Sequence, residues 1–293
     1  MSDTESNKSG SQGSGSAAAS ASASAEKATG PMWKEGEERT ITVRVLPGSQ
    51  YCNKLLAALD SKHIPYYVHF VNPRKLDKEL PPPHMVPVVD LVKGGETETM
   101  VDSKAILQKC DELMTGAAFY PSDDVTALDA WLDSHFNVMV WYYNWVDEDG
   151  FNASIAPRVA AQIPWFAKFF LTPQKLLKKR RGELSERVAK VYPDVIGNAE
   201  AAAKQLADNI KELDGHLKTD EQQWLCGTDE PSAADFGAFG MIHHLVGESG
   251  DAKLMPCRAT ALKDADVPRL SAWWERISTK YPLQYLNKRP PKK

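Results

Sequence analysis

The stretch that decides the fold is ITVRVLPGSQYCNKLLAAL, residues 41–59. Apolar residues alternate in its first part, which predicts a strand over 40–46, and a Pro47-Gly48 turn follows. Apolar residues then recur at helical spacing, which predicts a helix over 50–62. Ser49 therefore lies at the mouth of a helix, and Cys52 lies in its first turn. The unpaired N–H groups at such a mouth stabilise a thiolate, whether it belongs to the protein or to a bound thiol.

The pattern that follows predicts a small α/β domain. A second alternating run over 66–71 completes a βαβ unit, for which a right-handed parallel crossover is expected. The further elements predicted for this half are a loop over 72–83, strands over 86–92 and 96–101, and a helix over 102–113. This order, βαβ and then ββα, is typical of a thioredoxin-like domain.

The second half of the chain shows helical periodicity alone. Helices are predicted over 128–146, 184–217, 236–246 and 267–281, and Pro231 to Asp235 form a capping signature before the third of them. We therefore predict an α+β protein of two domains. A thioredoxin-like domain spans 38–115 and an all-helical domain spans 124–287. A low-complexity, disordered tail is predicted over 1–37 and a basic tail over 288–293.

Composition excludes several classes of partner. The net charge of -4 and the pI near 6.0 lack the basic footprint that binding nucleic acid requires. The four cysteines form no CxxC pair, which argues against a zinc site and is typical of free thiols in a reducing compartment. No uncharged apolar run is long enough to span a membrane. A cytoplasmic location is expected, with an organelle, addressed by the Ser/Ala-rich tail, as the alternative.

Several short motifs carry a resemblance to a known family. Ser49-Gln50-Tyr51-Cys52, Val86-Pro87 and Asp102-Ser103-Lys104-Ala105-Ile106 occur in an order that resembles the cytosolic glutathione transferase superfamily, over residues 40–286. Pro231 to Phe236 is similar to the capping box of that family's helical domain. The resemblance implies a glutathione cofactor, and the spacing of the cysteines leaves no metal site expected.

Within that superfamily, the chain looks closest to the type-2 membrane-associated prostaglandin E synthases and their glutaredoxin-like relatives. Ile64-Pro65-Tyr66, Val71-Asn72-Pro73 and the long insert over 153–181 carry this likeness. That subfamily has Cys-Pro-Phe-Cys at the mouth, whereas Ser49 stands here in place of the first Cys. The Ser-x-x-Cys mouth is similar to the serine-type transferases instead.

The mouth offers two candidate catalytic residues, Ser49 and Cys52. The thiol of glutathione is mostly protonated at neutral pH, and a hydroxyl at the mouth would stabilise its thiolate by donating a hydrogen bond. We assign that role to Ser49, with simple helix capping as the alternative. Cys52 is the alternative nucleophile, as a monothiol, although a thiol one turn into a helix is more often buried and inert.

The resemblance also implies which residues hold glutathione. Pro87 is expected to be cis, so that the backbone of Val86 meets the cysteinyl group of the ligand. Asp102 is expected to bind the α-amino group, and Ser103 the γ-glutamyl carboxylate at a helix N-terminus. Ordinary helix capping is the alternative for both, and the two roles are compatible.

Two further regions are candidates for binding. Trp131, His135 and Tyr142 lie on the helix that lines the acceptor-substrate pocket in the family, and packing in the core is the alternative for each. Residues 163–181 mix aromatic and basic side chains, which would suit weak contact with an anionic membrane surface. Packing of that insert on the helical domain is the interpretation that we favour from sequence.

The favoured function is a transferase that joins glutathione to a small apolar electrophile. The alternatives are an isomerase acting on a prostaglandin-endoperoxide-like substrate, a monothiol oxidoreductase, and a non-catalytic interaction module. The expected partners are a small-molecule electrophile and no nucleic acid, with weak membrane contact through 163–181 and a second copy of the chain as further candidates.

Overall fold

The computed structural model describes residues 39–73, 75–116, 118–167, 170–246 and 261–283. The tails predicted over 1–37 and 288–293 lie outside the described residues.

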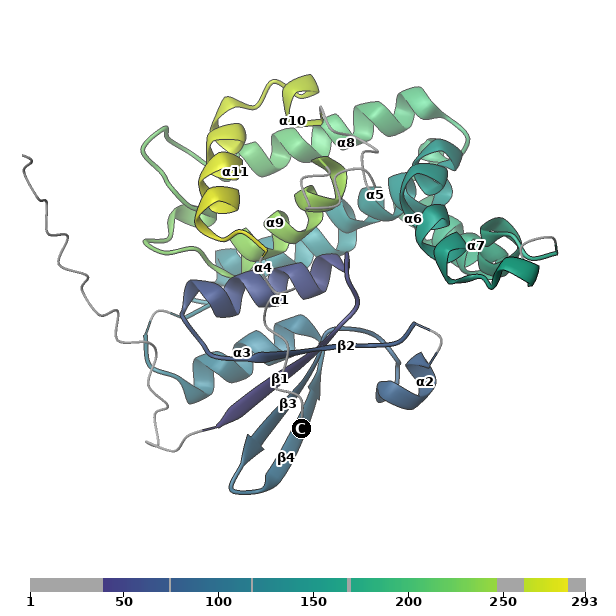
Figure 1. The fold of residues 1–293 in the computed structure, drawn as a ribbon. Helices are drawn as coiled ribbons and strands as arrows, with labels where there is room; N and C mark the ends of the chain where they lie inside the picture. The colour runs from purple at the N-terminus through teal and green to yellow at the C-terminus, as the bar shows by residue number, and fades with distance from the viewer. Residues whose placement is uncertain (1–38, 74, 117, 168–169, 247–260, 284–293) are drawn as a thin grey trace, which may run out of the picture.

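The first half is built on one four-stranded sheet (Figure 1). Its strands are β1 (Thr40–Val45), β2 (Tyr67–Phe70), β3 (Val88–Lys93) and β4 (Glu96–Val101), in the order β2-β1-β3-β4. β1 runs parallel to β2, and β3 runs antiparallel to both β1 and β4. The predicted thioredoxin-like arrangement is therefore confirmed.

The two faces of this sheet are covered differently. Val43 and Leu91 belong to the large core that also holds residues of α1 (Gln50–Ser61) and α3 (Ser103–Leu113). Val88 points into a smaller apolar cluster with Val71 and Leu80, beside the short helix α2 (Leu76–Glu79). This alternation is what a strand with two covered faces requires.

The second half contains helices without strands in its described part, as predicted. One helical run begins with α4 (Asp123–Trp131) and continues through two π-helical turns, Leu132–Phe136 and Tyr142–Val146, on either side of α5 (Asn137–Trp141). The later helices are α6 (Glu148–Gln162), α7 (Pro173–Val191), α8 (Ala199–Asp214), α9 (Ala233–Val246), α10 (Ala261–Asp264) and α11 (Pro268–Lys280). Short 3₁₀ turns cover Trp165–Ala167, Pro193–Val195 and Leu225–Gly227.

The single long helix predicted over 184–217 is wrong, because this segment forms α7 and α8 with a break between them. Pro193 opens a 3₁₀ turn there, and Gly197 takes a left-handed conformation with a φ of 71°. Proline cannot continue a helix, and glycine takes positive φ at no steric cost. The apolar spacing misled the prediction because both helices bury one face, through residues such as Val188 and Leu206.

The capping signature before α9 is confirmed in its geometry. Asp235 accepts a hydrogen bond from the backbone N–H of Ser232 at 2.9 Å and another from the Ser232 hydroxyl at 2.8 Å. It also accepts from the indole of Trp273 at 2.8 Å. The carboxylate therefore starts α9 and ties it to α11.

The two halves meet where α1 packs along α9. A Cβ atom on Gly240 would lie 2.3 Å from the carbonyl oxygen of Gln50, so no larger residue fits at this crossing. Apolar side chains of both helices, including Leu55 and Phe239, are fully buried in the same core. α1 therefore has a fixed position between the sheet and the helical domain, and so does its N-terminal mouth.

Candidate functional site

The sheet register brings the predicted glutathione-binding segments to one edge. Val88 pairs with Arg44 near the end of β1 and with Val101 at the end of β4. The chain therefore leaves β1 toward Ser49, enters β3 from Val86 and leaves β4 toward Asp102 at the same edge of the sheet. Residues far apart in sequence become neighbours because antiparallel strands alternate their direction.

Ser49 is the N-cap residue of α1. Its hydroxyl oxygen accepts a hydrogen bond from the backbone N–H of Cys52 at 3.4 Å, and its own N–H donates to the carbonyl of Leu46 at 3.1 Å. The side chain is half-buried. A hydroxyl has one donor and two acceptor positions, so capping the helix leaves its ability to donate intact.

Cys52 is buried in the first turn of α1. The side chain is 1% exposed. Burial raises the pKa of the Cys52 thiol to about 11, although hydrogen bonds with Ser49 and with the backbone of Leu46 oppose the shift. A thiol that is protonated at neutral pH and closed to solvent is a poor nucleophile. The geometry therefore argues against the monothiol alternative.

The Val86–Pro87 peptide bond is cis, as the family resemblance implied. Pro87 is buried and Val86 is half-buried, with its side chain against the apolar cluster of Val71 and Leu80. The predicted strand over 86–92 begins only at Val88, because Pro87 has no backbone N–H to donate to the ladder. That the backbone of Val86 meets a ligand stays a prediction.

Asp102 and Ser103 form the start of α3. Asp102 has a φ of 77°, and its Oδ1 accepts from the backbone N–H groups of Lys104 at 2.8 Å and Ala105 at 3.4 Å. Ser103 is 5% exposed. The capping role proposed as the alternative is therefore present at Asp102, whose side chain is exposed at the sheet edge. Binding of an α-amino group by Asp102 stays a prediction.

A polar contact that the sequence did not indicate fixes the first turn of α1. Asn137, fully buried on α5, accepts a hydrogen bond from Gln50 at 2.8 Å and donates one to the Tyr51 hydroxyl at 2.8 Å. The Tyr51 hydroxyl also faces the carboxylate of Asp133, and burial together with that negative charge raises the pKa of Tyr51. Burial likewise raises the pKa of Asp133, against the opposing charge of Lys54.

Arg158 places a positive charge beside the mouth. The guanidinium of Arg158, on α6, lies against Gly48, where a Cβ atom would be 2.3 Å from Nη1. Gly48, with a φ of 80°, makes room for it. Burial, with His243 and Arg158 as positive neighbours, lowers the pKa of His244 to about 3, and His244 shares a hydrogen bond with the backbone of Gly48. The sequence offered no signal for Arg158, because its partner lies 110 positions away.

The three candidate acceptor-pocket residues contact other rings of the helical domain. His135 stacks on Trp131, with ring centroids 6.2 Å apart, and meets Tyr192 edge-on at 6.3 Å. Tyr142 is 5% exposed and packs edge-on against Tyr143 at 5.0 Å. These contacts agree with the packing alternative, and an acceptor pocket at Trp131, His135 and Tyr142 stays a prediction.

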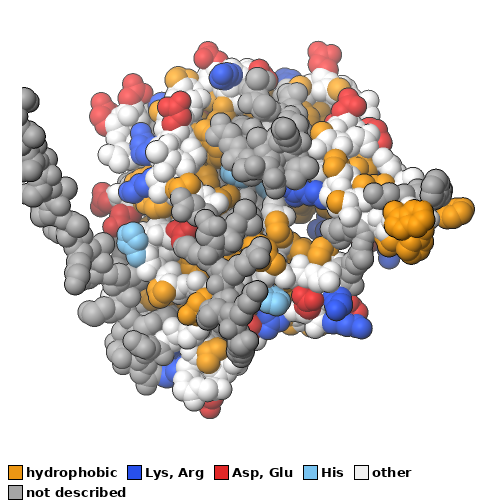
Figure 2. Space-filling model, in the orientation of Figure 1, with side chains coloured by type: hydrophobic (Ala, Val, Ile, Leu, Met, Phe, Trp, Pro, Cys, Tyr) orange, Lys and Arg blue, Asp and Glu red, His pale blue; other side chains and the backbone are white. Residues whose placement is uncertain are grey.

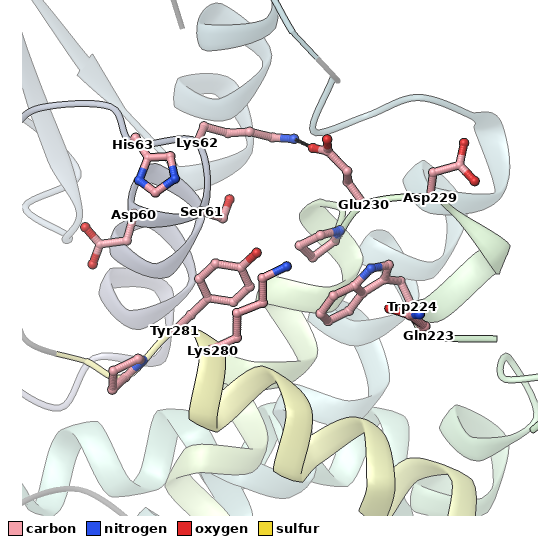
Figure 3. A pocket seen from close by; sticks show the side chains of 12 residues that line it. Asp60, Ser61, Lys62, His63, Gln223, Trp224, Asp229, Glu230, Lys280 and Tyr281 are labelled. Carbon is pink, nitrogen blue, oxygen red and sulfur yellow. Dashed lines mark hydrogen bonds and ion pairs between the residues drawn. The ribbon is translucent and has the colours of Figure 1, made fainter. Parts of the chain in front are cut away.

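A separate cavity of about 620 Å³ lies at the far end of α1 (Figure 3). Lys62 and Glu230 form an ion pair at its rim, and the ammonium of Lys280 lies 5.5 Å from the centroid of Trp224 and 5.4 Å from that of Tyr281. α1 has 12 residues, so its two ends are roughly 18 Å apart. The cavity is therefore distinct from the mouth at Ser49.

Metal and membrane-spanning features are absent from the part of the chain that the structure describes. No group of three or more His, Cys, Asp or Glu side chains in these residues is arranged to hold a metal ion. No helix in the same ranges combines the length and apolar character needed to cross a bilayer.

Two family models match the chain. The N-terminal domain of glutathione S-transferase matches residues 45–117, and the C-terminal domain of glutathione S-transferase matches residues 196–276. Comparison with curated proteins finds no matching sequence. The first match contains the mouth and the sheet edge, and the second contains α8, α9 and most of α11.

Solved structures share the fold at low sequence identity. FzlA from C. crescentus is 16% identical, covers 86% of this chain and 94% of its own, and has a TM-score of 0.55. The beta-etherase LigF from Sphingobium sp. strain SYK-6 is 17% identical, with coverages of 82% and 95% and a TM-score of 0.54. A maleylacetoacetate isomerase from Anaeromyxobacter dehalogenans 2CP-1, with bound glutathione, is 16% identical, with coverages of 88% and 98% and a TM-score of 0.50.

Proposed function

We infer, from a chain that carries both domains of the glutathione transferase superfamily, that this protein binds glutathione and transfers it to a small apolar electrophile. The observation that carries the proposal is the position of Ser49. This hydroxyl caps α1 at the sheet edge that also presents Val86 and Asp102. A helix N-terminus favours negative charge, because it is the positive end of the helix dipole. A thiolate bound at this mouth would therefore lie beside both that positive end and a hydroxyl that can donate a hydrogen bond.

Different residues would bind the glutathione peptide and activate its thiol. Val86 would hold the cysteinyl backbone, Asp102 the α-amino group, and Ser103 the γ-glutamyl carboxylate. Ser49 would donate a hydrogen bond to the sulfur. Its effect is on the thiol pKa, because a bond to the charged form favours that form.

Arg158 supports the same chemistry from the helical domain. Its guanidinium lies against Gly48, the residue before Ser49. A positive charge beside the mouth favours the thiolate over the thiol, and because Arg158 is half-buried the effect is only partly screened. The mouth therefore combines a hydroxyl, a helix N-terminus and a cation.

The remaining functional alternatives lack an observation that favours them. A monothiol oxidoreductase would need Cys52, which is buried and has a raised pKa. A prostaglandin-endoperoxide isomerase would also need glutathione bound at the mouth, and this alternative rests on the subfamily likeness. A non-catalytic module would need no glutathione affinity at all.

Calorimetric titration with glutathione separates the module from the enzymes. We expect saturable binding by the full chain, and the absence of binding would support the module instead. A panel of electrophiles, peroxides and endoperoxides then distinguishes transfer from isomerisation. Ser49→Ala should lower turnover near neutral pH by about tenfold or more, with partial recovery at higher pH. Loss of activity in Cys52→Ala, with Ser49→Ala unaffected, would reverse the assignment.

The proposal extends to assembly and location. A second copy of the chain is the proposed protein partner, and sedimentation equilibrium would test it. The proposed location is the cytoplasm, and a fluorescent fusion of the full chain would distinguish it from the organelle alternative.

A further inference from the structure

An exposed aromatic tip projects from the helical domain between α6 and α7. Trp165, Phe166 and Phe170 are 78%, 61% and 76% exposed, and Leu171 and Leu176 are 41% and 47% exposed. We call these five residues the aromatic tip. The α6–α7 end stands away from the sheet in Figure 1, and Figure 2 shows a patch of hydrophobic side chains there. A cluster of large apolar side chains at one exposed end indicates a surface that something else covers.

Three lysines flank the aromatic tip on the first turns of α7. Lys175, Lys178 and Lys179 are all exposed. Their spacing of three and four places them on neighbouring positions of one helix face. Among the described residues, none of the three takes part in an ion pair. We call them the lysine row, and their charge is free to meet an anionic surface.

Arg181, in contrast to the lysine row, uses its charge in contacts within the helical domain. Its guanidinium donates to the carbonyl oxygens of Trp145 at 2.7 Å and Val146 at 3.1 Å, and its Cζ lies 4.2 Å from the centroid of the Phe151 ring. Leu184 and Val188 of α7 are fully buried. The helix pair α6–α7 is therefore anchored to the helical domain through Arg181, Leu184 and Val188. The aromatic tip and the lysine row lie outside the core.

We propose that the aromatic tip and the lysine row dock this protein on the surface of an anionic lipid membrane. Aromatic side chains favour the boundary between headgroups and acyl chains, and lysines beside them meet the lipid phosphates. Residues 163–181 contain no Asp or Glu, whereas the whole chain carries a net charge of -4. Electrostatics would therefore orient the molecule with this end toward the membrane.

The shape of the aromatic tip favours lipid over a protein partner. The rings of Trp165 and Phe166 stand on a protruding 3₁₀ turn, edge-on at 6.2 Å, rather than in a groove. A convex aromatic turn enters a fluid interface without needing a matching pocket. The contact is peripheral, and it does not depend on glutathione chemistry at the mouth.

Co-sedimentation of the full chain with vesicles tests the proposal. Vesicles of phosphatidylcholine with about 30% phosphatidylserine supply the anionic surface, and phosphatidylcholine alone is the comparison. We expect binding to the anionic vesicles that is at least tenfold stronger and that weakens as salt rises from about 0.1 M to about 0.5 M. Trp165→Ser with Phe166→Ser, and separately Lys175→Gln with Lys178→Gln and Lys179→Gln, should each reduce it about tenfold or more.

Matched variants elsewhere on the surface are the controls. Lys211→Gln with Lys218→Gln and Lys263→Gln changes the net charge equally, and Ile196→Ser removes an exposed apolar side chain. Both should bind vesicles like the unmodified chain. The absence of binding to anionic vesicles, or equal losses in the control variants, would overturn the proposal. So would a tip variant that changes the oligomeric state in light scattering, since the tip would then be a protein interface.

Discussion

Lys54 of α1 and Asp129 of α4 form an ion pair, with Nζ and Oδ1 2.5 Å apart, and their side chains are 2% and 1% exposed. The second oxygen of Asp129 accepts a hydrogen bond from the Tyr120 hydroxyl at 2.6 Å. The pair joins the thioredoxin-like half to the helical half of the molecule. It lies on the helix whose N-terminus carries Ser49, so it helps to fix the mouth against the second domain.

Removing one member of this pair should destabilise the protein strongly. Lys54→Met leaves the Asp129 carboxylate buried without its cation, which typically costs about 3–5 kcal/mol. Urea unfolding followed by circular dichroism measures this loss. Lys109→Met is the control, because Lys109 pairs with Glu112 at the surface, where a pair contributes about 0–1 kcal/mol. Equal losses of stability in the two variants would mean that the buried pair contributes no more to stability than a surface pair.

The close crossing of α1 and α9 predicts an asymmetry between two glycines. A Cβ on Gly240 would lie 2.3 Å from the Gln50 carbonyl oxygen, which is backbone and moves only with the helix. We expect Gly240→Ala to cost about 1–3 kcal/mol or more, through overpacking. Gly182→Ala, in α7 where the new methyl group meets no atom within 4 Å beyond the adjacent backbone of its own helix, should instead stabilise by up to about 1 kcal/mol. Thermal unfolding of both variants decides this, and a stabilised Gly240→Ala would contradict the packing described for α1.

Local patterns predicted the fold well because its elements are signalled locally. The Pro47-Gly48 turn with the Ser49 cap, and the capping box at Asp235, lie within a few residues of the elements that they start. The break between α7 and α8 was missed, because apolar periodicity outweighed Pro193 and Gly197 in the prediction. Asn137 and Arg158 were missed for another reason. Their partners at the mouth are about 90 and 110 positions away, and no local pattern records such a contact.

Acid should destabilise the protein in part through His244. Burial lowers its pKa to about 3, from an ordinary value of about 6.5, with His243 and Arg158 as positive neighbours. Between these two values the unfolded chain binds a proton that the folded protein does not. Stability therefore falls as the pH falls through this window, by up to about 1.4 kcal/mol per pH unit for this group.

Comparison with His244→Gln isolates that contribution. Denaturant unfolding between about pH 5 and pH 8 should show a shallower loss of stability on acidification in the variant, whose amide does not titrate. At the alkaline end of the range, the free energies of unfolding of the two proteins should change in parallel with pH, because the imidazole is neutral in both the folded and the unfolded protein. Identical slopes across the acid range would show that His244 does not titrate as described.

Arg158→Gln tests whether the helical domain contributes to the mouth. If the guanidinium favours the thiolate, the variant should raise the pKa of the bound glutathione thiol by about half a unit to one unit, because a half-buried charge is partly screened. Calorimetry should show nearly unchanged affinity at a pH where the thiol is protonated. A normal thiol pKa combined with a lost preference for acceptors that carry a carboxylate would mean that Arg158 binds the acceptor instead.

The thiol pKa of bound glutathione in the Ser49→Ala variant tests the central claim most directly. Ultraviolet absorbance of the thiolate, recorded as a pH titration of the complex, gives this pKa without any acceptor substrate. We expect the unmodified protein to hold it well below the value of a free thiol, near 8.5, and Ser49→Ala to raise it by about one to two units while glutathione still binds. A bound thiol with the pKa of free glutathione in the unmodified protein, or an unchanged pKa in Ser49→Ala, would contradict the assignment of Ser49.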